Sequence, residues 1–146
     1  MKLDHFVSLA NEIHVRNLRL KKLIPATLGK GDSLFIPSPF RAVIQEFIPE
    51  NLGMGQGMIM GKNDKNFPSD LFLYKKNSFV PYKEANLMLI PAEAVIASIS
   101  IFEDISKVEQ GLENWIQIQH EIKAFSAIFS WEGEKPGTES LLNKLS

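Results

Sequence analysis

The run from Ala94 to Phe102 constrains the fold more than any other segment of the sequence. It is rich in Ile and Val and contains neither Gly nor Pro. Such a run is typical of a buried β-strand, because branched side chains pack well on a pleated surface. Ser106 and Glu109 follow it with the spacing of a capping box, which predicts a helix start. A buried strand that leads into a helix indicates an α/β fold whose helix crosses back to the same sheet.

Apolar spacing predicts the other elements. Residues 2–22, 39–48 and 107–123 have the periodicity of helices, and Pro49 is expected to end the second of these. Strands are expected at 57–61, 71–74, 94–102 and 125–131, all in one sheet, with a polar connection over residues 75–86. Pro and Gly residues between Pro25 and Pro39 predict a join between an N-terminal helical extension, residues 1–30, and an α/β domain, residues 31–146.

The expected core residues are apolar and lie on the inner faces of these elements. They are Val43, Phe47, Val95, Ala97, Ile99, Ile101, Leu112, Ile116, Ala127 and Phe129.

Composition limits the classes of function. The 146 residues suffice for one domain with its own core, and the net charge of −1 gives no bulk attraction to nucleic acid. The chain has no Cys, which excludes thiolate metal sites and disulfides and fits a reducing cytoplasm. Neither a signal-peptide core nor a run of membrane-spanning length is present, so a cytoplasmic protein is expected.

The element order resembles the restriction-endonuclease-like, PD-(D/E)XK superfamily, and more narrowly an uncharacterised bacterial domain family within it. The resemblance covers residues 38–131, and Ile90-Pro91-Ala92-Glu93-Ala94-Val95 is its most specific part. Arg41-Ala42 falls where that family has Arg-Glu, and Asp70 falls on its strand Asp. Ser100-Ile101-Phe102 falls on its Glu-Val-Lys. The resemblance therefore implies a mixed sheet flanked by helices, with a phosphodiesterase site that has lost most of its charged groups.

Asp70 has two interpretations. As a metal ligand it would hold Mg²⁺ together with other carboxylates, because a hard cation needs several oxygen ligands. As a turn or capping residue it would serve the backbone, and Pro-Ser-Asp is ordinary turn chemistry, so this second interpretation is preferred. Strand alternation is expected to put Ser100, Phe102 and Asp104 on the face of Asp70, with Glu103 pointing away.

Three functions follow from the resemblance. The preferred hypothesis is a degenerate nuclease-fold protein, without a cofactor, that binds a protein partner or itself. The second is a Mg²⁺-dependent DNA or RNA nuclease whose ligands have moved, with Asp70, Glu93 and Asp104 as candidate catalytic residues and Lys107, Glu109 and Lys123 as candidates on the next helix. The third is nucleic-acid binding without cleavage.

Two sequence features suggest a contact surface for a partner. The first is the apolar stripe of the N-terminal helix, for which packing on the protein's own core is an equal alternative; it comprises Leu3, Phe6, Leu9, Ala10 and Ile13. The second is a set of aromatic residues in predicted loops, which would either cover the core or meet a partner; they are Phe35, Phe67, Phe79 and Tyr82.

Overall fold

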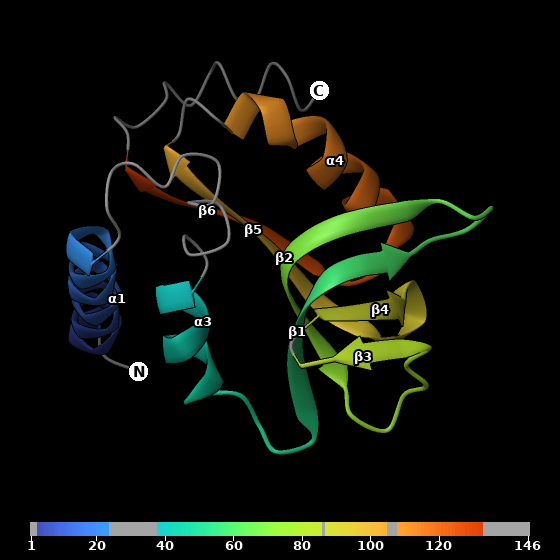
Figure 1. Cartoon of the computed structure of the whole chain (residues 1–146), viewed down its shortest axis with the longest axis horizontal. Helices are drawn as coiled ribbons and strands as arrows, with labels where there is room; N and C mark the ends of the chain where they lie inside the picture. The colour runs from blue at the N-terminus through green and yellow to red at the C-terminus, as the bar shows by residue number, and fades with distance from the viewer. Residues whose placement is uncertain (1–2, 24–37, 86, 105–107, 133–146) are drawn as a thin grey trace.

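A mixed β-sheet with helices on both faces forms the framework of the protein (Figure 1). The structure, a computed structural model, describes residues 3–23, 38–85, 87–104 and 108–132. The helices are α1 (Leu3–Leu23), α3 (Ser38–Gln45) and α4 (Val108–Glu121), with a 3₁₀ turn η2 (Ala92–Ala94). The strands are β1 (Leu52–Met60), β2 (Asn66–Lys75), β3 (Tyr82–Glu84), β4 (Leu87–Pro91), β5 (Val95–Asp104) and β6 (Phe125–Glu132).

The strand order in this part of the chain is β3-β4-β1-β2-β5-β6. Antiparallel pairing joins β1 to β2, β2 to β5 and β3 to β4. Parallel pairing joins β1 to β4 and β5 to β6, and α4 makes the crossover between β5 and β6. The predicted α/β class and the interior position of β5 are therefore confirmed.

Each face of the sheet has its own apolar core. On the α4 face, Phe72 and Ile59 are fully buried together with Ile118 of α4. On the opposite face, Leu71 and Ile101 pack with Val43 of α3 and Ile13 of α1. Leu9 also packs against this second cluster. The N-terminal helix thus uses part of its apolar stripe to cover the protein's own sheet.

The predicted elements occur with altered ends. The strands expected at 57–61 and 71–74 are longer, so the Gly-rich run from Gly53 belongs to β1 and Pro68-Ser69-Asp70 belongs to β2 rather than to a turn. The prediction of a connection over residues 75–86 missed β3, a short strand whose residues are all exposed. The predicted boundary at residue 30 lies outside the described residues.

The predicted core is confirmed for five buried residues, Val43, Val95, Ala97, Ile101 and Leu112, while Ile99, Ile116, Ala127 and Phe129 are half-buried and one prediction is wrong. Phe47 is 53% exposed, because α3 ends at Gln45 and the chain then turns away from the helical face. The i to i+3 hydrogen bond from Phe47 N to the Ile44 carbonyl, at 2.9 Å, marks that change. Of the loop aromatics, Phe67 is buried in β2, Phe79 and Tyr82 are exposed, and Phe35 lies outside the described residues.

Helices α1 and α3 cover only part of their face of the sheet (Figure 1). Beyond them, Met58 of β1 lies beside Leu89 of β4, and Leu89 pairs with Tyr82 of β3. These three residues and Leu87 form what we call the open face, since Met58 is 37%, Tyr82 47% and Leu87 51% exposed. Apolar residues therefore remain accessible on this side of the sheet.

Gly57 and Ala85 offer a test of backbone strain. Gly57 has a φ of 131°, and a Cβ there would lie 2.2 Å from the Met88 carbonyl oxygen. Ala85 has a φ of 50°, which costs an alanine more than a glycine. We expect Gly57→Ala to lower the free energy of unfolding by about 3 kcal/mol, and Ala85→Gly to raise it by up to about 1 kcal/mol. Urea denaturation of both variants measures the two changes. A Gly57→Ala variant as stable as the wild type would contradict the close pairing of β1 with β4.

Candidate functional site

A bulge in β2 sets the position of Asp70. Gly55 of β1 pairs with Phe72 and Gly57 pairs with Ser69, so Asp70 and Leu71 together oppose the single residue Gln56. The extra residue reverses the alternation of side chains along β2. Phe72 and Phe67 both lie in the core on the α4 face, although they are five positions apart in sequence. Asp70 and Leu71 consequently share the face toward α3.

The carboxylate of Asp70 is bound to the backbone of the neighbouring strand. Ile101 donates its N–H to Asp70 Oδ2 at 2.9 Å, just beyond the last regular pair of the two strands, Leu71 with Ile99. Loss of hydration raises the pKa of Asp70, while the Ile101 hydrogen bond and the positive charge of Arg41 partly offset that increase. Asp70 therefore caps a backbone N–H within the sheet. The prediction of a capping residue holds, whereas the prediction of a turn does not, because Asp70 lies in β2.

The predicted partners of Asp70 on β5 lie on the other side of the sheet. Phe102 reaches α4, because a Cβ on Gly111 would lie 2.3 Å from its ring. Ser98 pairs with Phe72 of the α4 face and exchanges a hydroxyl hydrogen bond with Ser69 at 3.0 Å. Alternation then gives Ser100 the same face, where it is buried. The predicted face for Ser100 and Phe102 is wrong, because the β2 bulge turns Asp70 away from them.

Ile99 and Ile101 are the described β5 residues that lie beside Asp70 on its face of the sheet. Ile101 is buried in the cluster with Leu71, and Ile99 packs against that cluster. Both positions are apolar, so neither supplies a carboxylate or a lysine to Asp70. Glu103 and Asp104 continue β5, but their side chains are outside the described part of the protein.

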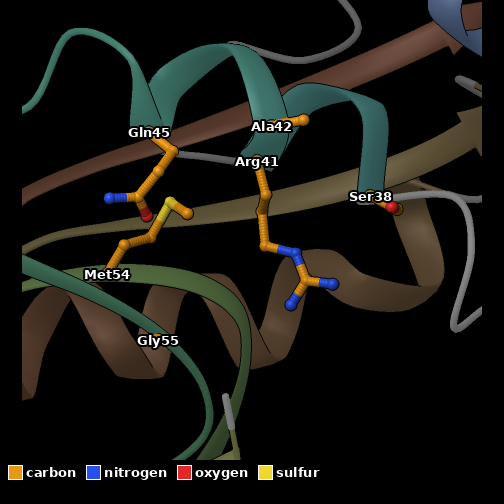
Figure 2. A pocket seen from close by; sticks show the side chains of 6 residues that line it. All are labelled: Ser38, Arg41, Ala42, Gln45, Met54 and Gly55. Carbon is orange, nitrogen blue, oxygen red and sulfur yellow. The ribbon is translucent and has the colours of Figure 1, made fainter. Parts of the chain in front are cut away.

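Arg41 is the charged residue whose electrostatic influence reaches Asp70, without a direct ion pair between them. It extends from α3 over the sheet, as Figure 2 shows, and donates a hydrogen bond to Gln56, the residue opposite the bulge. Partial burial lowers the pKa of Arg41, and the negative charge of Asp70 raises it again. Arg41 lines a cavity of about 260 Å³ between α3 and β1, together with Ser38, Ala42, Gln45, Met54 and Gly55.

These residues do not fit a magnesium site. One carboxylate oxygen of Asp70 already accepts the Ile101 N–H, and the nearest opposite charge is a guanidinium. Mg²⁺ needs several oxygen ligands to repay its dehydration, and a cation close by raises the cost of binding it. Among the described residues, no group of three or more His, Cys, Asp or Glu side chains comes together.

Glu93 lies in a different place from Asp70. It is exposed on η2 and lines a separate cavity of about 290 Å³ with Lys62, Glu121 and Lys123. In that cavity the Lys62 backbone N–H donates to Glu121 Oε2 at 3.2 Å. The structure therefore does not bring Glu93 or Lys123 to Asp70, and Lys107 and the side chain of Glu109 are outside the described part.

Sequence reasoning missed Arg41 and Gln56 as site residues. Arg41 was visible as the arginine of the Arg-Ala pair, but its meeting with Asp70 depends on the packing of α3. Gln56 is the polar residue within the Gly-rich run, and it was obscured by the prediction of a flexible turn there.

Solved structures share this architecture. NucC from P. aeruginosa ATCC27853, in its cAAA-bound form, matches with a TM-score of 0.77 and 15% identity, over 99% of this chain and 71% of that one. NucC from E. coli MS115-1 matches with TM-scores of 0.69 in its cAAA-bound form and 0.61 in its apo form. The identities to these two are 13% and 12%, and each match covers 92% of this chain and 64% of that one.

NucC is a PD-(D/E)XK-type nuclease. The fold of the chain is restriction-endonuclease-like. At these identities the likeness shows the fold alone, and the chain spans less than two thirds of the E. coli protein. No protein-family model matches the sequence, and no curated protein matches it, so the narrower bacterial family stays a prediction. None of the described helices is both long and apolar enough to cross a membrane.

Two substitutions separate the charge of Asp70 from its role as an acceptor. The pKa of Asp70 is raised from its ordinary value of 3.8, so the folded state holds the proton more tightly than the unfolded state does. The stability that this group contributes is therefore present below that pH and is lost as the pH rises through the raised pKa. Asp70→Asn keeps an oxygen for the Ile101 N–H and removes the charge. We expect it to be at least as stable as the wild type at pH 7.

Asp70→Ala removes the acceptor as well. We expect it to lose about 1–3 kcal/mol, the usual cost of a buried donor without a partner. Denaturation at several pH values compares both variants with the wild type. A variant Asp70→Asn as unstable as Asp70→Ala at pH 7 would show that the ionised carboxylate is needed for folding.

Proposed function

We propose that this protein is a catalytically degenerate nuclease-fold protein that acts by binding another protein chain, a second copy of itself included. The observation that carries the proposal is the environment of Asp70. Its carboxylate accepts the N–H of Ile101 and meets the charge of Arg41. Phosphodiester hydrolysis with a metal needs an anionic cage around the ion and a charged group that handles the nucleophile. The described residues around Asp70 provide neither.

The apolar character of β5 supports the loss of activity. Ile101 is only 6% exposed and belongs to the core cluster with Leu71 and Val43. A carboxylate at this position would have to enter an apolar core, where an unpaired charge is very costly. The face of β5 toward Asp70 therefore serves packing.

The open face supports a binding role. It joins exposed apolar residues of β1, β4 and β3, and Phe79, in the connection that leads to β3, is 78% exposed. Aromatic residues and Met are enriched at protein interfaces, and contiguous exposed apolar surface often marks a contact site. The stripe of α1 supports the proposal less, since Ile13 and Leu9 pack on the protein's own core.

Cleavage of DNA or RNA with Mg²⁺ is the second candidate, supported by the fold shared with NucC. It would require a further carboxylate ligand such as Asp104, and a cation such as Lys107, close to Asp70. Nucleic-acid binding without cleavage is a third candidate, and the net charge of −1 gives it little electrostatic support. The lack of Cys agrees with a reducing compartment such as the cytoplasm.

Nuclease assays test the loss of catalysis. We expect no cleavage of single-stranded or double-stranded DNA or RNA above background with Mg²⁺ or Mn²⁺, because Asp70 lacks further ligands for the ion. Gel analysis of end-labelled substrates over several hours provides the measurement. Cleavage that depends on the metal and disappears in Asp70→Asn would refute the proposal and support relocated ligands, with Asp104→Asn and Lys107→Gln as the next variants.

Charge placed on the open face tests the binding role. Met58 and Leu87 are exposed, so Met58→Lys with Leu87→Lys should leave the free energy of unfolding within about 1 kcal/mol of the wild type. We expect the double variant to lose self-association, measured as molar mass by light scattering. If the wild type is a monomer, we expect loss of the chains that crosslink to it in cells.

Val7→Lys with Val15→Lys is the matched control. These residues are 53% and 47% exposed on α1, which lies on the other side of the molecule from β3 and β4 (Figure 1). The control pair should keep every association of the wild type. If both double variants associate equally, the open face is not the contact surface.

A further inference from the structure

The cavity beside α3 contains a cation with unused hydrogen-bonding capacity. A guanidinium has five N–H donors. In the described part of the protein, the hydrogen-bond partner of Arg41 is the side-chain oxygen of Gln56, and no ion pair within 4.0 Å joins Arg41 to Asp70. Arg41 is nevertheless partly buried, where unmet donors and an unpaired charge are costly. Its remaining donors therefore have room for an acceptor.

The other lining residues would admit an acceptor with negative charge. Ser38 and Gln45 add a hydroxyl and an amide, and Ala42, Met54 and Gly55 add no charged side chain. Among the described residues, no carboxylate lines the cavity. The charge of Asp70 would oppose an anion, but its Oδ2 atom accepts the Ile101 N–H, and this hydrogen bond fixes the carboxylate at β5.

We propose that this cavity binds an oxyanion group, a phosphate or a carboxylate, through the guanidinium of Arg41. The planar guanidinium matches the paired oxygens of such groups and can donate two parallel hydrogen bonds to them. Ser38 and Gln45 line the same cavity and carry donors that suit the remaining oxygens. A site of this kind is the electrostatic reverse of a metal centre, because it attracts an anion rather than a cation.

Two other cavities among the described residues are less suited to an anion. The cavity of Glu93 also contains Glu121, so carboxylates oppose its two lysines. The cavity between α1 and α3 is lined mostly by apolar residues, among them Leu9, Ile13 and Phe40. Arg41, by contrast, has only neutral neighbours among the described residues that line its cavity.

Titration with inorganic phosphate tests the proposal. Backbone amide shifts are followed by NMR in the ¹⁵N-labelled full chain, with sodium chloride at equal ionic strength as the reference. We expect saturable shifts at Ser38–Gln45 and at Gln56, in the low millimolar range or tighter. Sodium acetate is titrated in parallel, and the anion that binds more tightly identifies the favoured group as phosphate or carboxylate.

Three variants give a pattern that non-specific binding would not produce. Arg41→Gln should weaken phosphate binding roughly tenfold or more, since it removes charged donors worth more than one tenfold step. Arg19→Gln, at an exposed position on α1, should leave it unchanged. Asp70→Asn should strengthen it several-fold, because a nearby negative charge is removed.

Equal phosphate binding by Arg41→Gln and the wild type would overturn the proposal, as would shifts scattered over surface lysines. Weaker binding by Asp70→Asn, with its fold intact by circular dichroism, would also overturn it. The proposal does not rest on partner binding. Loss of the open-face contact would leave phosphate binding intact, and loss of phosphate binding would leave the open face unaffected.

Discussion

The hydrogen bond from Ile101 to Asp70, together with the bulge that makes it possible, determines how the centre of the sheet is built. In a regular β2, successive residues alternate, so Asp70 and Leu71 would lie on opposite faces of the sheet. The extra residue keeps Leu71 in the core beside α3 and brings the carboxylate to the point where β2 and β5 stop pairing regularly. Side-chain oxygen then replaces backbone oxygen as the acceptor for β5, and the sheet continues without a lost hydrogen bond.

This arrangement also explains why the fold was easier to predict than the site. Ala94–Phe102 and the helix after it carry strong periodic signals, and apolar burial reproduced them in the structure. A bulge leaves no comparable signal, because one added residue changes the facing of a strand without changing its composition. Ser100 and Phe102 were therefore assigned to the wrong face, although the strand that contains them was predicted correctly.

Short elements were lost for a different reason. Strand β3 has three residues, all exposed, so it presents no alternation to detect. It forms because β4 offers a partner edge, which is a property of the assembled sheet. Phe47 shows the converse case, since its helical spacing was regular but the helix ended before reaching it. Tertiary context decided both cases.

The glycines of β1 affect how the sequence can change over time. Gly53 and Gly55 lie under Tyr74, Phe72 and Met88, and a Cβ at either glycine would come within 2.6 Å of one of these side chains. Large neighbours thus lean across the part of β1, Gly53 to Gly57, that has no side chains of its own on that face. In most enzymes the catalytic residues tolerate the fewest substitutions. Here the packing of Tyr74, Phe72 and Met88 over the glycine run restricts substitution in β1, so we expect related sequences to differ around Asp70 before they differ at these glycines.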